Sequence, residues 1–215
     1  FHIDGAFGAL GMLSMRLRPR LVGLERADSV AFDFHKWGQV PYDAGCILVR
    51  DRALLIDTFA ADAAYLQRAT RGLAAGSPWP CDLGPDLSRS FRALKVYYTL
   101  SVIGADALGH AIDRTCDVAQ HLVARIEAER ELERVGPASL NIVCFRYRFD
   151  ADADRRQLEL AADLQEGGIA APSTTRLDGH VVLRAAIVNH RTTERDVEAL
   201  VDQTLVMGRR RARSG

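Results

Sequence analysis

The chain has 215 residues, of which 48% are hydrophobic and 26% are charged, proportions that are ordinary for a globular protein with a sizeable core. Its formal net charge is +0, so no overall field favours nucleic acid or an anionic membrane surface as a partner. No apolar run is long enough to span a bilayer, and the four cysteines are widely spaced without a C-x-x-C pair. This composition predicts a cytoplasmic protein that holds no metal ion and no disulfide scaffold.

The first part of the chain alternates short apolar runs with loops. Phe1–Ala6 has the pattern of a strand end that presents Asp4, followed by small residues. An apolar, β-branched run over Ser29–Phe34 predicts a buried strand that ends shortly before Lys36, and Gly45–Arg50 predicts a second strand. The other segments expected here are a loop with a short helical turn at Leu10–Leu24, a short helix at Arg52–Thr58 and a long loop at Ala60–Pro85.

The second part of the chain shows helical periodicity. Apolar residues at steps of three and four predict helices over Asp86–Ile103, Asp106–Glu133, Arg155–Gly167 and Thr193–Val206. Asp86 or Ser88 is expected to cap the first of these helices, and the charged residues at 127–133 are expected to form a solvated face of the second.

Strands are predicted between the last two helices and before them. The expected strands are Leu140–Phe149, Ile169–Leu177 and His180–Val188. Asp178-Gly179 separates the last two strands and is a typical hairpin turn. The arginine-rich end of the chain predicts a solvated, disordered tail at 209–215.

Lysine is rare in this chain. Of the 28 basic side chains only two are lysines, Lys36 and Lys95. An amine can act as a nucleophile, whereas a guanidinium stays protonated. Lys36 follows one predicted strand, while Asp4 ends another and is followed by Ala6. A pyridoxal phosphate site requires such a set: a lysine that forms a Schiff base, a carboxylate that keeps the pyridine nitrogen protonated, and a small residue against the ring.

Five stretches extend this pattern over nearly the whole chain. They are H-I-D-G-A at 2–6, A-D-S-V-A-F-D-F-H-K-W at 27–37, the region of Tyr65, L-S-R-S-F-R-A-L-K at 87–95 and L-N-I-V-C-F-R-Y at 140–147. Together they resemble the carboxy-terminal portion of the group II pyridoxal-phosphate decarboxylases, the aromatic-L-amino-acid and glutamate decarboxylase family. The resemblance implies an α/β fold of the fold-type I transferase-like class. It departs from the family at Asp33-Phe34, where an Asn- or Asp-Pro pair is common.

The resemblance implies a role for each candidate residue. Lys36 would carry pyridoxal 5'-phosphate, Asp4 would pair with the pyridine nitrogen, and Ala6 would lie against one face of the ring. His35 resembles the family histidine that contacts the phosphate, and general acid–base catalysis is its alternative role. Tyr65 resembles a tyrosine on a mobile loop that closes over the site and protonates the α-carbon after CO2 leaves. By residue type alone, Tyr65 would be an ordinary loop tyrosine packed on an apolar patch.

The roles of three further residues remain open. By resemblance Arg89 braces the active site or a dimer interface, and otherwise it is a solvated or structural arginine. Arg184, on the last predicted strand, would approach the substrate carboxylate or stabilise a domain contact. Lys95 matches a family lysine and is expected to be structural.

The expected organisation follows from the same resemblance. Residues 1–103 would form the incomplete carboxy-terminal part of the cofactor-binding large domain, with a mobile loop at 60–85. Residues 104–208 would form a linking helix and a small α/β domain, followed by the basic tail at 209–215. Because the chain opens inside a motif and its relatives are longer, we expect a carboxy-terminal fragment, a processed product or one subunit of a split enzyme.

The expected reaction is decarboxylation of an aromatic or acidic L-amino acid to the amine and CO2. The partners expected are this small-molecule substrate and either a second copy in a homodimer or a complementing amino-terminal segment, with no nucleic acid and no membrane. Two alternatives remain: another fold-type I reaction, such as decarboxylation-dependent oxidative deamination or transamination, or an inactive truncated paralogue.

Overall fold

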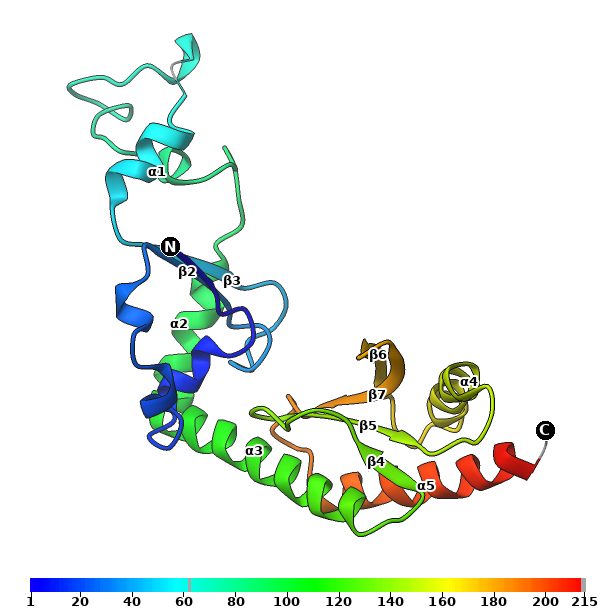
Figure 1. Ribbon diagram of the computed structural model, residues 1–215. Coiled ribbons are helices and arrows are strands. Elements are labelled where there is room, and N and C mark those ends of the chain that lie inside the picture. Colours follow the sequence, from blue (N-terminus) through cyan, green and yellow to red (C-terminus); the bar gives the residue numbers. More distant parts are fainter. Residues whose placement is uncertain (62, 214–215) are drawn as a thin grey trace. The chain divides into compact units, whose positions relative to one another are not determined.

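The computed structural model describes residues 1–61 and 63–213 and divides into two compact units (Figure 1). The first unit comprises Phe1–Met12 and Leu17–Ala105, and the second comprises Leu13–Arg16 and the chain from Asp106 onward. Residue 62 of the expected loop and residues 214–215 of the expected tail lie outside the described residues.

A three-stranded sheet organises the first unit. Strand β1 (His2–Asp4) pairs in parallel with β2 (Ser29–Asp33), and β2 pairs antiparallel with β3 (Gly45–Val49). In this register Asp4 lies opposite Ala31, and Asp33 lies opposite Gly45. The strands predicted at these three places are confirmed, because their short β-branched and apolar runs fit a pleated, half-buried surface.

The turn after β1 requires a glycine. A Cβ added to Gly5 would lie 2.6 Å from the Cβ of Ala9, which opens the 3-10 turn Ala9–Leu13. Ala9 in turn packs with Ala27 and Val30 in the small buried cluster of this unit. The close approach lets the chain leave β1 directly after Asp4, which fixes where that carboxylate lies. Two more 3-10 turns, Arg18–Leu21 and Leu24–Arg26, fill the segment that was expected to be mainly loop.

The helices of the first unit are α1 (Arg52–Phe59) and α2 (Arg92–Ile103). The prediction of α1 is confirmed, and the Asp51 carboxylate caps it by accepting a hydrogen bond from the Ala53 backbone N–H at 2.9 Å. The predicted start of α2 at residue 86 is wrong, as is its cap, because the helix begins six residues later and no side chain caps it. Leu87 is exposed, so its place in the apolar spacing does not reflect a buried helical face.

The second unit contains a four-stranded antiparallel sheet with the order β4-β5-β7-β6. Its elements in chain order are α3 (Ala105–Glu127), β4 (Leu132–Arg134), β5 (Ile142–Tyr147), α4 (Ala153–Glu166), β6 (Ser173–Leu177), β7 (His180–Ala186) and α5 (Glu194–Arg213). The predicted hairpin is confirmed, since β6 and β7 pair directly and both turn residues, Asp178 and Gly179, have positive φ as a two-residue turn requires.

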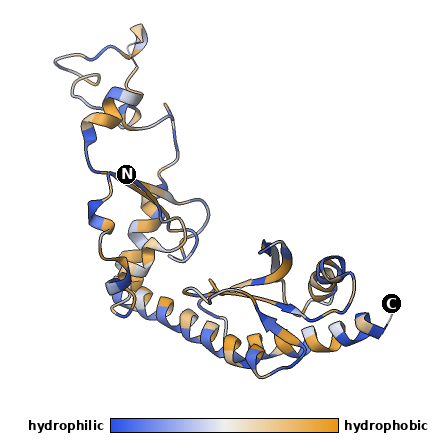
Figure 2. Ribbon diagram, viewed as in Figure 1, coloured by the Kyte–Doolittle hydropathy of each residue, from blue (hydrophilic) through white to orange (hydrophobic). Residues whose placement is uncertain are grey.

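One buried core joins the sheet and the three helices of this unit. Hydrophobic residues recur along the turns of α3 (Figure 2), which gives the helix an apolar stripe. Fully buried members of the core include Leu122 of α3, Phe145 of β5, Leu160 of α4, Leu183 of β7 and Val201 of α5. Burial of side chains of this size contributes about 1.5–3 kcal/mol each, so this core is the main source of stability in the second unit.

Three sequence expectations for the second unit are wrong. Helix α3 ends at Glu127, and Leu132–Arg134 is a strand, so the acidic residues after the helix do not belong to a solvated helical face. Strand β6 begins at Ser173 because Pro172 has no N–H for the ladder. The described part of the basic tail is not disordered, because α5 continues to Arg213.

Ion pairs explain the length of α5. Arg209 donates hydrogen bonds to Glu131, and Arg211 donates to the carboxylates of Asp163 and Glu159 on α4. These ion pairs hold the last turns of the helix in place, whereas Arg209, Arg210 and Arg213 remain exposed to solvent as predicted. Among the helices within 1–61 and 63–213, none is long and apolar enough to cross a membrane.

Candidate functional site

Asp4 and the segment that carries Lys36 lie at the same edge of the first sheet. Strands β1 and β2 are parallel neighbours, so their carboxyl ends meet at one edge, where side chains gather to form sites in α/β folds. Asp4 is the last residue of β1, and Lys36 follows the end of β2. The exposed Asp4 carboxylate accepts a hydrogen bond of 3.0 Å from the backbone N–H of Ala6. This short loop bond orients the carboxylate at the edge of the sheet.

The Lys36 amine is paired with a carboxylate that the sequence pattern did not single out. Its Nζ lies 2.6 Å from Oδ2 of Asp33, and the Lys36 side chain is 42% exposed. Asp33 lies opposite Gly45 of β3, where an added Cβ would come within 3.2 Å of its Oδ1. The missing side chain at position 45 therefore leaves room for the carboxylate that holds the lysine.

His35 is held in a defined orientation. Its Nδ1 accepts a hydrogen bond of 2.9 Å from the backbone N–H of Ala44, and its ring centroid lies 4.4 Å from that of Tyr42. A neutral imidazole that accepts at Nδ1 carries its proton on Nε2. Nε2 lies 3.9 Å from Oδ2 of Asp33, so the same carboxylate faces both His35 and Lys36.

Backbone hydrogen bonds and close packing fix the loop around Lys36. The Phe34 backbone N–H donates to the carbonyl of Ala44 at 2.9 Å, and the Val40 N–H donates to the carbonyl of Phe34 at 3.1 Å. A Cβ on Gly38 would lie 2.7 Å from the Phe34 carbonyl oxygen, so only glycine fits there without a shift. Trp37 is 1% exposed, and its ring stacks on that of Phe7. Lys36 is thus carried by a tightly packed loop.

The far end of this loop is bonded to α2. The Asp43 carboxylate accepts a hydrogen bond of 2.7 Å from Nε of Arg92, the first residue of the helix, and lies 3.9 Å from Nζ of Lys95. The hydrogen bond from Arg92 holds the pKa of Asp43 below its ordinary value. Asp43 precedes Ala44, whose N–H fixes His35, so α2 is connected to the candidate site through two consecutive residues.

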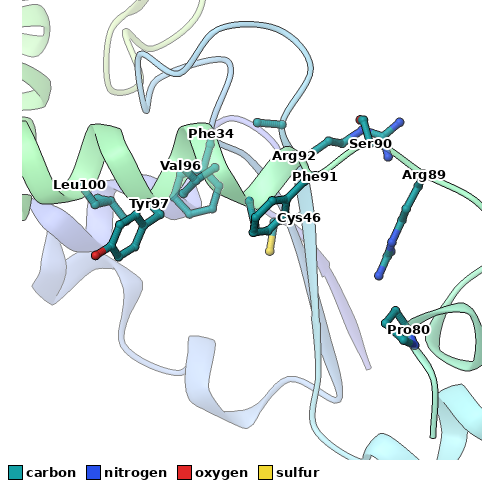
Figure 3. A pocket seen from close by; sticks show the side chains of 13 residues that line it. Phe34, Cys46, Pro80, Arg89, Ser90, Phe91, Arg92, Val96, Tyr97 and Leu100 are labelled. Atoms are coloured by element: carbon teal, nitrogen blue, oxygen red, sulfur yellow. The ribbon is translucent and has the colours of Figure 1, made fainter. Parts of the chain in front are cut away.

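A cavity of about 750 Å³ lies beside this loop, between the start of β3 and α2 (Figure 3). Its walls are mainly apolar, and Figure 3 shows Arg89 pointing from the segment before α2 towards Pro80. Lys36, Asp4 and Tyr65 are not among the described residues that line it. The cavity is therefore adjacent to the candidate site without containing its lysine.

Tyr65 and Arg184 are carried by other segments of the chain. Tyr65 lies in a 3-10 turn, Ala64–Leu66, and is 77% exposed. In the described part of the chain it makes no hydrogen bond or ion pair with Asp4, His35 or Lys36. Arg184 lies on β7 in the second unit, opposite Cys144 and Ser173.

The residues at the sheet edge fit pyridoxal phosphate by their donor chemistry. An accessible amine, an exposed carboxylate and an N–H on a fixed imidazole can serve an aldehyde, a pyridinium and a phosphate respectively. Within 1–61 and 63–213, no group of three or more His, Cys, Asp or Glu side chains is arranged to hold a metal ion.

Comparisons with known proteins agree with this chemistry. Residues 1–148 match the family model described as pyridoxal-dependent decarboxylase conserved domain, and the chain belongs to that family. It is 35% identical to the aromatic-L-amino-acid decarboxylase of Bacillus atrophaeus over 91% of this chain and 42% of the relative. It is 36% identical to the L-2,4-diaminobutyrate decarboxylase of Rhizobium meliloti, over 94% of this chain and 41% of the relative.

A solved structure shows the same fold. The crystal structure of Oryza sativa TDC with PLP and tryptamine superposes with a TM-score of 0.84 at 25% identity, over 98% of this chain and 44% of that chain. The predicted resemblance to the carboxy-terminal portion of group II decarboxylases and the predicted fold-type I α/β class are confirmed. The chain spans about two fifths of the length of these relatives.

Proposed function

We propose that this chain provides the cofactor-binding lysine and the proton-handling residues of a pyridoxal 5'-phosphate-dependent decarboxylase that acts on an aromatic or acidic L-amino acid. The observation that carries this proposal is the placement of Asp4 and the Lys36 segment at adjacent parallel strand ends, with the Lys36 side chain partly exposed to solvent. Membership of the pyridoxal-dependent decarboxylase family supports the same reaction.

Each residue at the sheet edge has a task that its chemistry supports. When bound, pyridoxal phosphate supplies a ring that accepts the electron pair of the breaking carbon–carboxylate bond. Lys36 binds the cofactor through Nζ, and Asp4 holds a proton on the pyridine nitrogen. Ala6 leaves room for a flat ring, and His35 offers its Nε2–H to the phosphate. General acid–base catalysis at the same Nε2 is the alternative role of His35.

Tyr65 is proposed to donate the proton from its hydroxyl to the α-carbon that loses the carboxylate. With this proton delivered, the product is the amine. Without it, dioxygen can take the electrons instead, and one amino acid with O2 and H2O yields the aldehyde, CO2, NH3 and H2O2. Because Tyr65 is exposed and has no direct contact with Lys36 in the described residues, this role requires its segment to approach the site.

A second copy of the chain or an amino-terminal segment is proposed to complete the site. The chain spans about two fifths of its relatives, and helix α2, which is rich in apolar residues, buries none of them fully. An apolar helix without a buried face is typical of a surface that a further part of the protein covers.

The test is CO2 release from a panel of aromatic and acidic L-amino acids in the presence of pyridoxal phosphate. The chain would be assayed alone and mixed with the amino-terminal part of the same protein. We expect a gain on mixing that is lost in Lys36→Arg and retained in Lys95→Arg. No gain with any amino acid would contradict the proposal and leave a reaction without CO2 release, such as transamination, or an inactive paralogue.

A further inference from the structure

The segment between α1 and α2 carries a compact polar cluster. In its described part, 60–61 and 63–91, the only regular elements are two 3-10 turns, Ala64–Leu66 and Pro80–Leu83. Three side chains bring these turns together: Arg68, Trp79 and Asp82. A segment of this length without an apolar core depends on such contacts for a fixed shape.

Arg68 is the centre of the cluster. Its Nη2 donates to Oδ1 and Oδ2 of Asp82 at 2.5 and 2.7 Å, and its Nη1 donates to the carbonyl of Leu66 at 2.7 Å. The guanidinium also lies 3.7 Å from the ring centroid of Trp79. One side chain thus joins the carbonyl next to Tyr65 to a carboxylate and an aromatic ring more than ten residues further along the chain.

Asp82 is built into the cluster rather than attached to its surface. It is 6% exposed, and its Oδ2 also accepts a hydrogen bond of 2.7 Å from the backbone N–H of Trp79. The hydrogen bonds from Arg68 and from the Trp79 N–H lower the pKa of Asp82, so the carboxylate stays charged at neutral pH. A buried charge that loses its partner is strongly unfavourable, so the Arg68–Asp82 pair resists opening.

The cluster connects the turn that contains Tyr65 to a second turn that packs against α1. The turn Pro80–Leu83 packs against α1, which belongs to the first unit. Tyr65 is 77% exposed, so its own packing does not fix its position. The contacts of Arg68 with the Leu66 carbonyl and with Asp82 connect the Tyr65 turn to the anchored turn.

We propose that Arg68 is a positioning residue for Tyr65. Together with Trp79 and Asp82, it holds the segment from 66 to 82 in one fixed shape while Tyr65 delivers its proton. This inference rests on the proposed function of Tyr65 as proton donor. The segment from 66 to 82 would then be a stiff unit attached to α1 through the turn Pro80–Leu83, and not a freely flexible loop.

The primary variant is Arg68→Lys, which keeps the charge but loses the fork that reaches Leu66 and Asp82 together. Its matched control is Arg71→Lys, the same change at an exposed arginine of the same segment. Asp82→Asn serves as a second variant that removes the charge from the opposite partner. Far-UV circular dichroism on each protein checks that the chain still folds.

The first readout needs no cofactor. The chain has two tryptophans, and Trp37 is only 1% exposed, so quenching of fluorescence by iodide reports mainly on Trp79. We expect Arg68→Lys and Asp82→Asn to raise the quenching constant of Trp79 about twofold or more, and Arg71→Lys to leave it unchanged. Unchanged quenching in the first two variants would show that Arg68 and Asp82 do not hold the segment from 66 to 82 together, and would overturn the proposal.

The second readout is the ratio of amine to aldehyde formed by the complemented enzyme under air. A misplaced proton donor should lower this ratio about tenfold in Arg68→Lys and Asp82→Asn, towards the value of Tyr65→Phe, but not in Arg71→Lys. If Tyr65→Phe shifts the ratio and Arg68→Lys does not, the positioning role is wrong while the proposed function stands. If Tyr65→Phe itself leaves the ratio unchanged, both the proton-donor role and the inference built on it fail.

Discussion

Nζ of Lys36 lies 2.6 Å from Oδ2 of Asp33, three residues earlier in the chain. The carboxylate holds the amine at the end of β2, so removing it should release the amine without unfolding the protein. For Asp33→Asn we expect Lys36 to react several-fold faster with an amine-modifying anhydride, followed by mass spectrometry, with Lys95 as the internal reference. Because the pair is partly exposed, the free energy of unfolding should fall by less than about 1 kcal/mol. Equal labelling of Lys36 in both proteins would contradict the pairing.

The hydrogen bond between Asp43 and Arg92 should stabilise the loop that carries Lys36. Arg92→Gln removes the guanidinium that Asp43 contacts, and the neighbouring Ala44 N–H, which donates to His35, should then exchange with solvent at least about fivefold faster. Hydrogen exchange of that amide is the measurement. Lys95→Gln is the graded control, since Lys95 lies farther from Asp43 and should have a smaller effect. An unchanged rate for Ala44 in Arg92→Gln would show that the loop does not depend on α2.

The raised pKa of Tyr147 predicts that the second unit loses stability at alkaline pH. Burial, together with its hydrogen bond of 2.9 Å to Glu131, raises the pKa of Tyr147 to about 12. A group whose pKa is raised on folding contributes stability that is complete below its unfolded pKa, near 10, and is lost as the pH rises through the folded value. Unfolding in urea should therefore become easier between about pH 10 and pH 12. Tyr147→Phe should flatten this dependence and cost about 1–2 kcal/mol at neutral pH, because Glu131 loses a donor.

An acid effect of opposite sign is expected at the same cluster. Hydrogen bonds from Arg209 and Tyr147 lower the pKa of Glu131, so its contribution is present above the unfolded pKa and is lost as the pH falls through the folded one. Glu131→Gln should therefore reduce the loss of stability that wild type shows below about pH 4.5. Urea unfolding at several acidic pH values measures this, with Asp150→Asn as an exposed control. A loss of equal size in both variants would contradict the role of the Arg209–Glu131 pair.

Local patterns in the sequence predicted much of the fold. The Asp178-Gly179 turn and the strands on each side of it follow from residue preferences that act over a few positions. The helical end at Arg209–Arg213 was missed because its stability comes from Glu131 and from two carboxylates of α4, which are distant in the sequence. Periodicity carries no information about such pairs.

The candidate site shows the same limit. Asp4, His35 and Lys36 are candidates from the sequence because each residue type has a known use at a strand end. Asp33, Asp43 and Arg92 were missed, although each contacts the site or its loop. Their roles depend on sheet register and on the distance between a loop and a helix, and a single sequence does not encode either in a local signal. Pairing the two predicted strands could have placed Asp33 opposite Gly45, and this is the one indication of its role that the sequence contains.

Lys36 is proposed to be the lysine that binds pyridoxal phosphate. The most direct measurement is an absorbance spectrum of the chain after addition of pyridoxal phosphate, followed by borohydride reduction and mass mapping of the adduct. We expect a visible absorption band and a reduced adduct on Lys36 that disappears in Lys36→Ala and persists in Lys95→Ala, with the amino-terminal part supplied if the chain alone binds weakly. An adduct on Lys95, or none on Lys36 in the complemented protein, would contradict it.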